Sequence, residues 1–126
     1  MVDVPCFVGI EVAKAQWDSA VRPCGERWAV PNDAGGVVTL VARLQALHPT
    51  LIVLEATGGL ERAATAALAT AGLPVVVVTP RQARDFARAP GQLAKTDTLD
   101  ARALAHFADV IRPTPRPLPD ARCRRK

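Results

Sequence analysis

Aromatic residues are scarce in this sequence. Its 126 residues include no Tyr, two Trp and three Phe, which make up 4% of the chain, although 49% of the residues are hydrophobic. A core with so few rings must be built from Val, Leu, Ile and Ala, and this composition favours β-strands covered by Ala-rich helices. The sequence therefore indicates an α/β fold, and its length suits one domain and excludes a second complete one.

Cysteine and histidine are also few. The three cysteines, Cys6, Cys24 and Cys123, form no CxxC pair, which argues against a disulfide framework and against a zinc site. The two histidines, His48 and His106, are far apart in the sequence and do not indicate a histidine-based metal centre. We therefore expect any metal ion to be held by oxygen ligands.

Long hydrophobic runs are absent. The longest apolar run, around residues 73–79, is much shorter than the ~20 residues that a transmembrane helix needs. The N-terminus carries Asp3, Glu11 and Lys14 and lacks the basic lead, apolar run and cleavage site of a secretory signal. These features predict a cytoplasmic protein with no membrane partner.

Positive charge is concentrated in the last third of the chain. Residues 1–80 hold five basic and seven acidic residues, whereas residues 81–126 hold eleven basic and five acidic ones. A one-sided basic surface attracts polyanions by neutralising phosphates and releasing counterions. Nucleic acid is therefore the first partner to consider, and a solubilising Arg-rich surface is the alternative.

Three short apolar runs open the chain, at residues 5–11, 17–21 and 27–30, and Pro and Gly lie between the last two. Their short connections predict an antiparallel meander of three strands. Apolar residues then recur at three- and four-residue spacing, at Val37, Leu40, Val41, Leu44 and Leu47. Because Asn32-Asp33 offers an N-cap before them, we expect an amphipathic helix here.

Two buried strands should follow. Residues 51–54 form a continuous aliphatic run that ends on Glu55, as in a strand buried on both faces. An Ala-rich helix over residues 60–71, closed by Gly72, leads to a second aliphatic run at residues 73–78. A crossover of this length predicts that the two strands are parallel, with a right-handed connection.

The rest of the chain is helical and then rich in proline. Residues 79–82 (TPRQ) have the pattern of a capping box, so a helix should begin there. Residues 97–111 should form the last helix, and from residue 112 on alternating prolines predict an extended linker or tail. We expect a domain over residues 1–112 and a Pro/Arg-rich linker or truncated tail over residues 113–126.

The predicted elements have the order of the ribonuclease-H-like fold: three antiparallel strands, then helix, strand, helix, strand and helix. This fold is a mixed sheet with helices on both faces. In that fold the first and fourth strands are neighbours, so Glu11 and Glu55 should project at the same edge. Asp97 and Asp100 share one face if both lie in the last helix, which could bring them to that edge. Simpler explanations exist as well. Asp97 and Asp100 could be the N-cap and the third residue of a helix, Glu55 could pair with an Arg, and Glu11 could lie on the surface.

Four carboxylates in one cleft would repel one another unless divalent cations neutralise them. Oxygen ligands without His or Cys favour Mg²⁺ or Mn²⁺ over zinc. Two such ions can activate a nucleophile on one side of a phosphorus and stabilise the leaving oxygen on the other. Converging acids would therefore imply phosphodiester cleavage or transfer.

Four segments carry a resemblance to a known family. They are VGIEVAKAQWD (8–18), LIVLEATGGLE (51–61), LPVVVVTPRQARDFARA (73–89) and GQLAKTDTLDARALAHFA (91–108). Together they resemble the DEDD transposases of the IS110 type, which include Piv-like DNA invertases and bridge-RNA-guided recombinases. The resemblance covers nearly all of residues 5–112, and a KTDxxDA stretch after a strand-ending LExTG is a specific combination.

The resemblance implies an N-terminal RuvC-like domain with Asp, Glu, Asp and Asp as catalytic metal ligands. By matching motif, these positions and their Mg²⁺ or Mn²⁺ fall on Glu11, Glu55, Asp97 and Asp100. The first position departs from the pattern, because Glu11 stands where the family has Asp. The longer side chain still offers an oxygen ligand, but it moves that oxygen in a geometry that Mg²⁺ holds strictly.

The resemblance also implies partners. Family members continue into a second domain that supplies a serine nucleophile, assemble as oligomers on DNA, and use a structured guide RNA to choose their sites. We therefore expect DNA, a guide RNA and further copies of the chain as partners, and little or no activity without the second domain. Basic residues beside the acids or in the preceding helix should contact phosphates. They are Lys14, Arg81, Arg84, Arg88 and Lys95.

Three functions fit these observations. The first is the catalytic domain of an insertion-sequence transposase or recombinase that cleaves and transfers DNA strands with divalent metal ions. The second is a catalytically silent, truncated remnant that binds nucleic acid or self-associates, which Glu11 and the missing second domain favour. The third is a stand-alone RuvC-like resolvase or nuclease, against which the proline-rich end argues.

Overall fold

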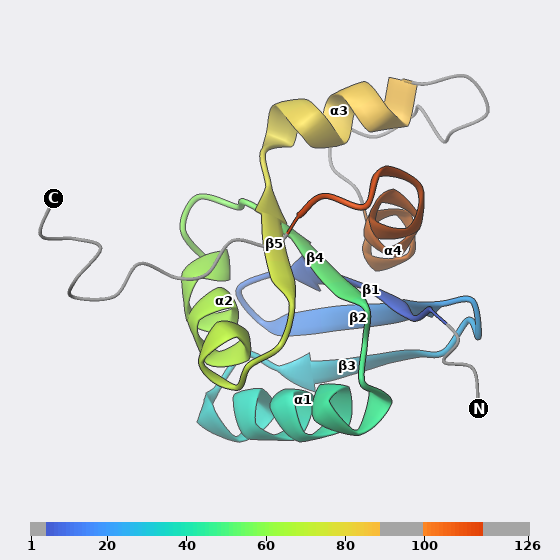
Figure 1. The fold of residues 1–126 in the computed structure, drawn as a ribbon. Coiled ribbons are helices and arrows are strands. Elements are labelled where there is room, and N and C mark those ends of the chain that lie inside the picture. Colours follow the sequence, from blue (N-terminus) through green and yellow to red (C-terminus); the bar gives the residue numbers. More distant parts are fainter. Residues whose placement is uncertain (1–4, 89–99, 115–126) are drawn as a thin grey trace, which may run out of the picture.

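The structure is a computed structural model that describes residues 5–88 and 100–114 (Figure 1). Three strands come first, helices and strands then alternate, and two consecutive helices come last in this part of the chain. The strands are β1 (Phe7–Val12), β2 (Gln16–Arg22), β3 (Arg27–Pro31), β4 (Leu51–Glu55) and β5 (Val75–Val78). The helices are α1 (Ala34–Leu47), α2 (Glu61–Thr70), α3 (Pro80–Arg88) and α4 (Ala101–Ile111).

The strands pair in one mixed sheet with the order β3-β2-β1-β4-β5. β1 and β2, and β2 and β3, are antiparallel, which confirms the predicted meander. β4 is parallel to β1 on one side and to β5 on the other. The first and fourth strands are therefore neighbours, as predicted.

Caps encoded in the sequence determine where several helices begin and end. The Asp33 carboxylate accepts a hydrogen bond from the N–H of Gly36 at 2.7 Å and so caps α1. Thr79 and Gln82 form the predicted capping box: each side-chain oxygen accepts from the other residue's N–H, at 3.0 and 2.9 Å. Gly72 follows α2 with φ 82°, the left-handed conformation expected after a helix end.

Helices cover both faces of the sheet (Figure 1). The larger core lies between the sheet and the pair α1 and α2, and Leu40, Leu44 and Leu68 belong to it. The smaller core lies between the sheet and the pair α3 and α4, where the rings of Phe86 and Phe107 meet edge-on at 5.2 Å between centroids. The predicted α/β class, a mixed sheet with helices on both faces, is confirmed.

Helix α4 lies directly against β1 because residue 9 has no side chain. A Cβ atom at Gly9 would be 2.2 Å from the carbonyl oxygen of Ala101 and 2.3 Å from the backbone nitrogen of Ala105. Both atoms belong to the helix backbone, so neither can turn away. Gly9 therefore allows the close approach of strand and helix.

Two predicted boundaries are wrong. The last helix begins at Ala101 and not at residue 97, because Asp100 is extended, with φ −78° and ψ 178°, and caps the helix. The last strand begins at Val75 and not at Leu73, because Pro74 has no N–H for the ladder. Residues 115–126 lie outside the described residues, so the domain boundary at residue 112 stays a prediction.

The described helices contain no membrane-spanning candidate: none of them is both long and apolar enough to cross a bilayer.

Candidate functional site

Glu11 and Glu55 lie at the same edge of the sheet. Ile10 pairs with Leu54 in the parallel β1–β4 ladder, and Glu11 and Glu55 are the next residues of the two strands. Ile10 and Leu54 point into the larger core, so the two glutamates point to the opposite face, which α4 covers. Glu55 is the last residue of β4 and is only 7% exposed.

Asp18 is a further acid at this edge, and it was not predicted from the sequence. It lies directly opposite Glu11 in the antiparallel β1–β2 ladder, so the two side chains share one face. Asp18 is half-buried and accepts a hydrogen bond from Nε2 of Gln16 at 3.0 Å. A signal was present in the sequence, because Trp17 is a core residue and alternation then turns Asp18 to the other face.

Asp100 reaches the same region from α4. Its carboxylate accepts a hydrogen bond from the N–H of Ala103 at 2.8 Å and caps the helix. The simpler explanation made Asp100 the third residue of a helix capped by Asp97, so the role of Asp100 as the N-cap differs from that prediction. The first turn of α4 rests on Gly9, which precedes Glu11 by two residues on the same face of β1. Asp97, the other acid of the KTDxxDA stretch, lies outside the described residues.

We call Glu11, Asp18, Glu55 and Asp100 together the acidic edge. The pKa of Glu11 is raised above its usual value of 4.5, first by burial and then by the negative charges of Asp18, Asp100 and Glu55. Among residues 5–88 and 100–114, neither Glu11 nor Asp18 forms an ion pair. The acidic edge therefore carries negative charge that the described cations do not neutralise at these two positions.

The acidic edge fits a hard divalent cation in donor type and in charge. Carboxylate oxygens are the ligands that Mg²⁺ and Mn²⁺ prefer. The arrangement is open, however: within the described ranges no three His, Cys, Asp or Glu side chains lie close enough together to hold a metal ion. A bound cation would have to draw these carboxylates together or use Asp97 as a further ligand.

The loop after Glu55 is held by Glu61. Oε1 of Glu61 accepts hydrogen bonds from the N–H groups of Thr57 at 2.8 Å and Gly59 at 3.2 Å. Burial acts to raise the pKa of Glu61, but these hydrogen bonds, together with one from its own backbone N–H and the charge of Arg62, lower the pKa below 4.5. Gly58 and Gly59 have φ 63° and 95°, a region that favours glycine. Residues 57–61 (TGGLE) therefore fix the conformation of the loop that follows Glu55 at the acidic edge.

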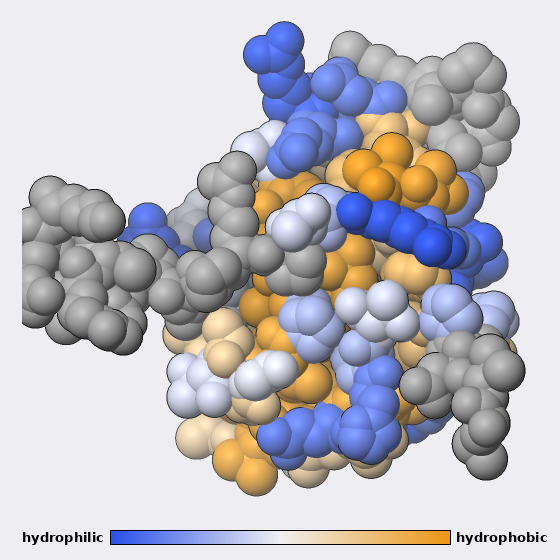
Figure 2. Space-filling view, viewed as in Figure 1, coloured by the Kyte–Doolittle hydropathy of each residue, from blue (hydrophilic) through white to orange (hydrophobic). Residues whose placement is uncertain are grey.

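Three of the predicted phosphate-binding residues have described side chains. Lys14 is exposed in the turn after β1, at the end of the sheet where the acidic edge lies. On α3, Arg81 is exposed and Arg84 is half-buried, and Figure 2 shows hydrophilic residues gathered over this helix. The side chain of Arg88 and all of Lys95 lie outside the described residues.

The fold is similar to that of solved RuvC structures. T. thermophilus RuvC in complex with a Holliday junction substrate matches with a TM-score of 0.60 and 16% sequence identity, over 90% of this chain and 100% of that chain. A second Thermus thermophilus RuvC structure matches with a TM-score of 0.48 and 20% identity, over 89% of this chain and 83% of that one. The first likeness shows that the fold is RuvC-like, within the ribonuclease-H-like class.

The sequence itself shows the family. No curated protein matches the chain, but residues 8–124 match the family model DEDD_Tnp_IS110, described as transposase. This match includes every residue of the acidic edge and both helices that cover its face. The chain therefore belongs to the IS110-type DEDD transposase family.

Proposed function

We propose that this chain is the catalytic domain of an insertion-sequence transposase that cleaves and transfers DNA strands with Mg²⁺ or Mn²⁺. The proposed metal ligands are Glu11, Glu55, Asp97 and Asp100. The observation that carries the proposal is the β1–β4 register, which brings Glu11 and Glu55 to adjacent strand ends on one face. Membership of a transposase family supports DNA as the substrate.

The chain's own residues would position the reaction. Glu11 and Glu55 extend from hydrogen-bonded strands in the middle of the sheet, and such rigid elements hold functional groups precisely in place. Asp100 is held by its hydrogen bond to Ala103 and by the docking of α4 on Gly9. Bound divalent cations would activate the attacking oxygen and stabilise the leaving one. Asp18 adds a negative charge that favours cation binding at this edge.

The proposed partners are those that the family resemblance implies. We propose that DNA phosphates contact Lys14, Arg81, Arg84, Arg88 and Lys95, because basic side chains beside a nuclease site position the backbone of the substrate. A structured guide RNA and further copies of the chain are proposed as the other partners. The exposed positions of Lys14 and Arg81 support the phosphate contacts.

A catalytically silent domain is the second candidate. Two observations favour it: Glu11 replaces the family's aspartate, and no three metal-ligating side chains of the described part lie within reach of one ion. On this alternative the acidic edge would bind no metal ion, and the chain would retain only nucleic-acid binding or self-association.

Calorimetric titration with Mn²⁺ separates the two candidates. The catalytic proposal predicts saturable binding that Glu55→Gln and Asp97→Asn each weaken at least about tenfold, because each removes a charged ligand. Glu11→Asp should strengthen binding. Asp85→Asn, which removes an exposed carboxylate from α3, is the matched control and should leave the affinity unchanged. A wild-type chain that binds no Mn²⁺ would support the silent alternative instead.

A further inference from the structure

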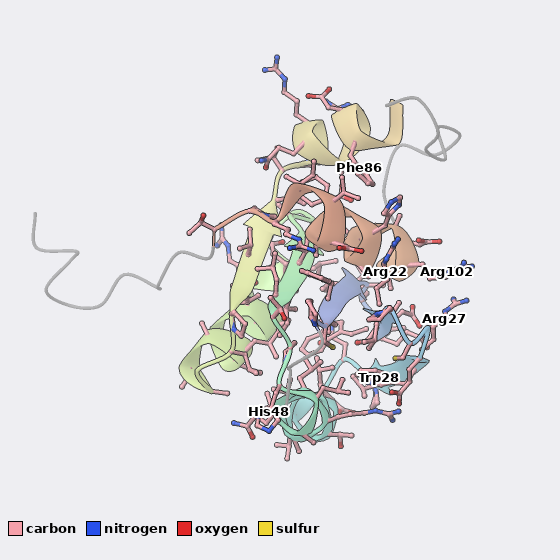
Figure 3. All side chains as sticks on the ribbon, turned by 45° about the vertical axis from the view of Figure 1, so that its right-hand side comes forward. Arg22, Arg27, Trp28, His48, Phe86 and Arg102 are labelled. Atoms are coloured by element: carbon pink, nitrogen blue, oxygen red, sulfur yellow. The ribbon has the colours of Figure 1, made fainter. Side chains whose placement is uncertain are left out.

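The structure points to a second nucleic-acid contact surface beside α4, formed by Arg22, Arg27 and Arg102. We propose that this surface, which we call the basic flank, binds a phosphodiester backbone and leads it toward the acidic edge. The inference rests on the proposed function in taking nucleic acid as the partner, and it adds residues outside the predicted phosphate contacts. Figure 3 shows the three labelled arginines on the same side of the molecule.

Arg22 and Arg27 are neighbours on one face of the sheet. Arg27 pairs with Ala20 across β2 and β3, and Arg22 lies two residues beyond Ala20 on β2. Alternate residues of a strand share a face, so Arg22 and Arg27 are diagonal neighbours. This is the face covered by α4, because Nε of Arg22 is 3.3 Å from Oδ2 of Asp109 in that helix.

Arg102 lies on the flank of α4 that faces β2 and β3. It precedes Asp109 by seven residues, or about two helical turns, so both side chains lie along the same flank. The opposite flank carries Leu104 and Phe107, which pack into the smaller core with residues of β4, β5 and α3. Arg102 is exposed.

The ladder register sets Arg102 against Arg27. The first turn of α4 rests on Gly9, and the row of paired residues through Gly9 continues to Ala20 and then to Arg27. Arg102, in that first turn, therefore faces Arg27 across the small side chain of Ala20.

The basic flank is open and only partly neutralised. Arg27 and Ala29 of β3 are exposed, while α4 packs chiefly on β1, β2 and β4. Of the three arginines of the basic flank, only Arg22 forms an ion pair within the described part of the chain, whereas Arg27 and Arg102 form none there. The charge of Arg22 also acts on His106, whose pKa is lowered by burial first and by Arg22 second, which favours the neutral imidazole. A polyanion would therefore meet unpaired guanidinium groups.

The chemistry and position of the basic flank favour a phosphodiester backbone. Guanidinium groups bind phosphate oxygens in a bidentate geometry and keep their charge at any working pH. Asp18 lies on the same face of β2 as Ala20 and Arg22, so the strip that begins at Arg22 ends at the acidic edge. A backbone bound along the flank would thus enter the site from the β2–β3 side.

The test is fluorescence anisotropy of labelled duplex DNA, single-stranded DNA and RNA with the full chain across a salt series. The double variant Arg27→Ala/Arg102→Ala should bind several-fold more weakly, with a slope of log affinity against log salt that is smaller by about 1.8 for duplex DNA. The control Arg62→Ala removes an exposed arginine from α2 on the other face and should change neither quantity. Comparison of the affinities for duplex DNA, single-stranded DNA and RNA shows which backbone the basic flank binds.

Two results would overturn the basic flank. One is a double variant that matches Arg62→Ala in affinity and salt slope, and the other is a wild-type chain that binds no nucleic acid even at low salt. Circular dichroism and the Tm verify that the variants fold, as expected for exposed side chains. Mn²⁺ titration distinguishes a failure of this proposal from a failure of the proposed function. The double variant should still bind Mn²⁺ like the wild type, and Glu55→Gln should still bind nucleic acid with the salt slope of the wild type.

Discussion

Glu11 and Asp18 face each other across the antiparallel pair β1 and β2, on the face of the sheet that α4 covers. Like charges directly opposite each other in a ladder destabilise it. The consequence is visible at Glu11, where burial and then Asp18 raise the pKa of the carboxyl group. The two carboxylates repel each other in the metal-free protein, and a bound cation would reduce this repulsion. Binding of a metal ion here should therefore stabilise the fold.

Neutralising Asp18 should stabilise the metal-free protein. Asp18→Asn removes the charge opposite Glu11 and keeps the size of the side chain, so the free energy of unfolding in EDTA should rise by about 0.2–1 kcal/mol. Urea unfolding followed by circular dichroism measures the change. Asp85→Asn on α3 is the control and should have no effect; equal results for the two variants would show that the pair does not repel.

The charge of Glu11 should appear in the pH dependence of stability. Its pKa is raised in the folded state, so the folded protein binds the proton more tightly than the unfolded chain, and stability falls as the pH rises from 4.5 through the folded pKa. Glu11→Gln should therefore gain stability over the wild type between pH 4 and pH 7 in EDTA. Unfolding curves at several pH values give this difference, and a difference that does not grow with pH contradicts the prediction.

Gly9 should tolerate no side chain. Gly9→Ala places a Cβ within 2.2 Å of the α4 backbone, so the helix must move and the free energy of unfolding should fall by about 1–3 kcal/mol or more. Mn²⁺ affinity should fall as well, because Asp100 moves with α4.

The matched control for Gly9→Ala is Gly35→Ala in α1, where the new Cβ would be 3.5 Å from Asp33 Oδ1. That variant should gain up to about 1 kcal/mol; a similar loss in both would contradict the close-packing argument.

His106 should make the protein less stable in mild acid. Burial, followed by the charge of Arg22, lowers its pKa below 6.5 in the folded state, so the unfolded chain binds the proton more readily. Stability is then present above pH 6.5 and is lost as the pH falls from 6.5 through the lower folded pKa. His106→Gln should flatten this part of the profile in a comparison of Tm between pH 5 and 7.5. A variant with the same pH dependence as the wild type would exclude His106 as its source.

Most of the fold could be predicted because its signals are local. Aliphatic runs mark the central strands, the capping box of Thr79 and Gln82 marks the start of α3, and Gly72 marks the end of α2. The start of α4 was wrong by several residues because Asp97 and Asp100 are both good capping residues, and only tertiary packing on Gly9 selects between such candidates.

The candidate site was predicted in part. The order of the elements was enough to place Glu11 next to Glu55, because it is the order of the ribonuclease-H-like fold, in which the first and fourth strands are neighbours. The position of Asp18 opposite Glu11 can be predicted only if the register of the β1–β2 hairpin is known. That register depends on the conformation of residues 13–15, and alternation alone does not give it. The basic flank was missed for the same reason, because Arg22, Arg27 and Arg102 become neighbours only through two registers and the docking of α4.

The most direct test of the account is a crystal structure of the chain soaked in Mn²⁺, with the ion located by its anomalous scattering. We predict an ion coordinated by oxygens of both Glu11 and Glu55, with either Asp97 or the α4 cap Asp100 completing the site. An ion that contacts neither glutamate, or no ion at the acidic edge at saturating Mn²⁺, would contradict the central claim.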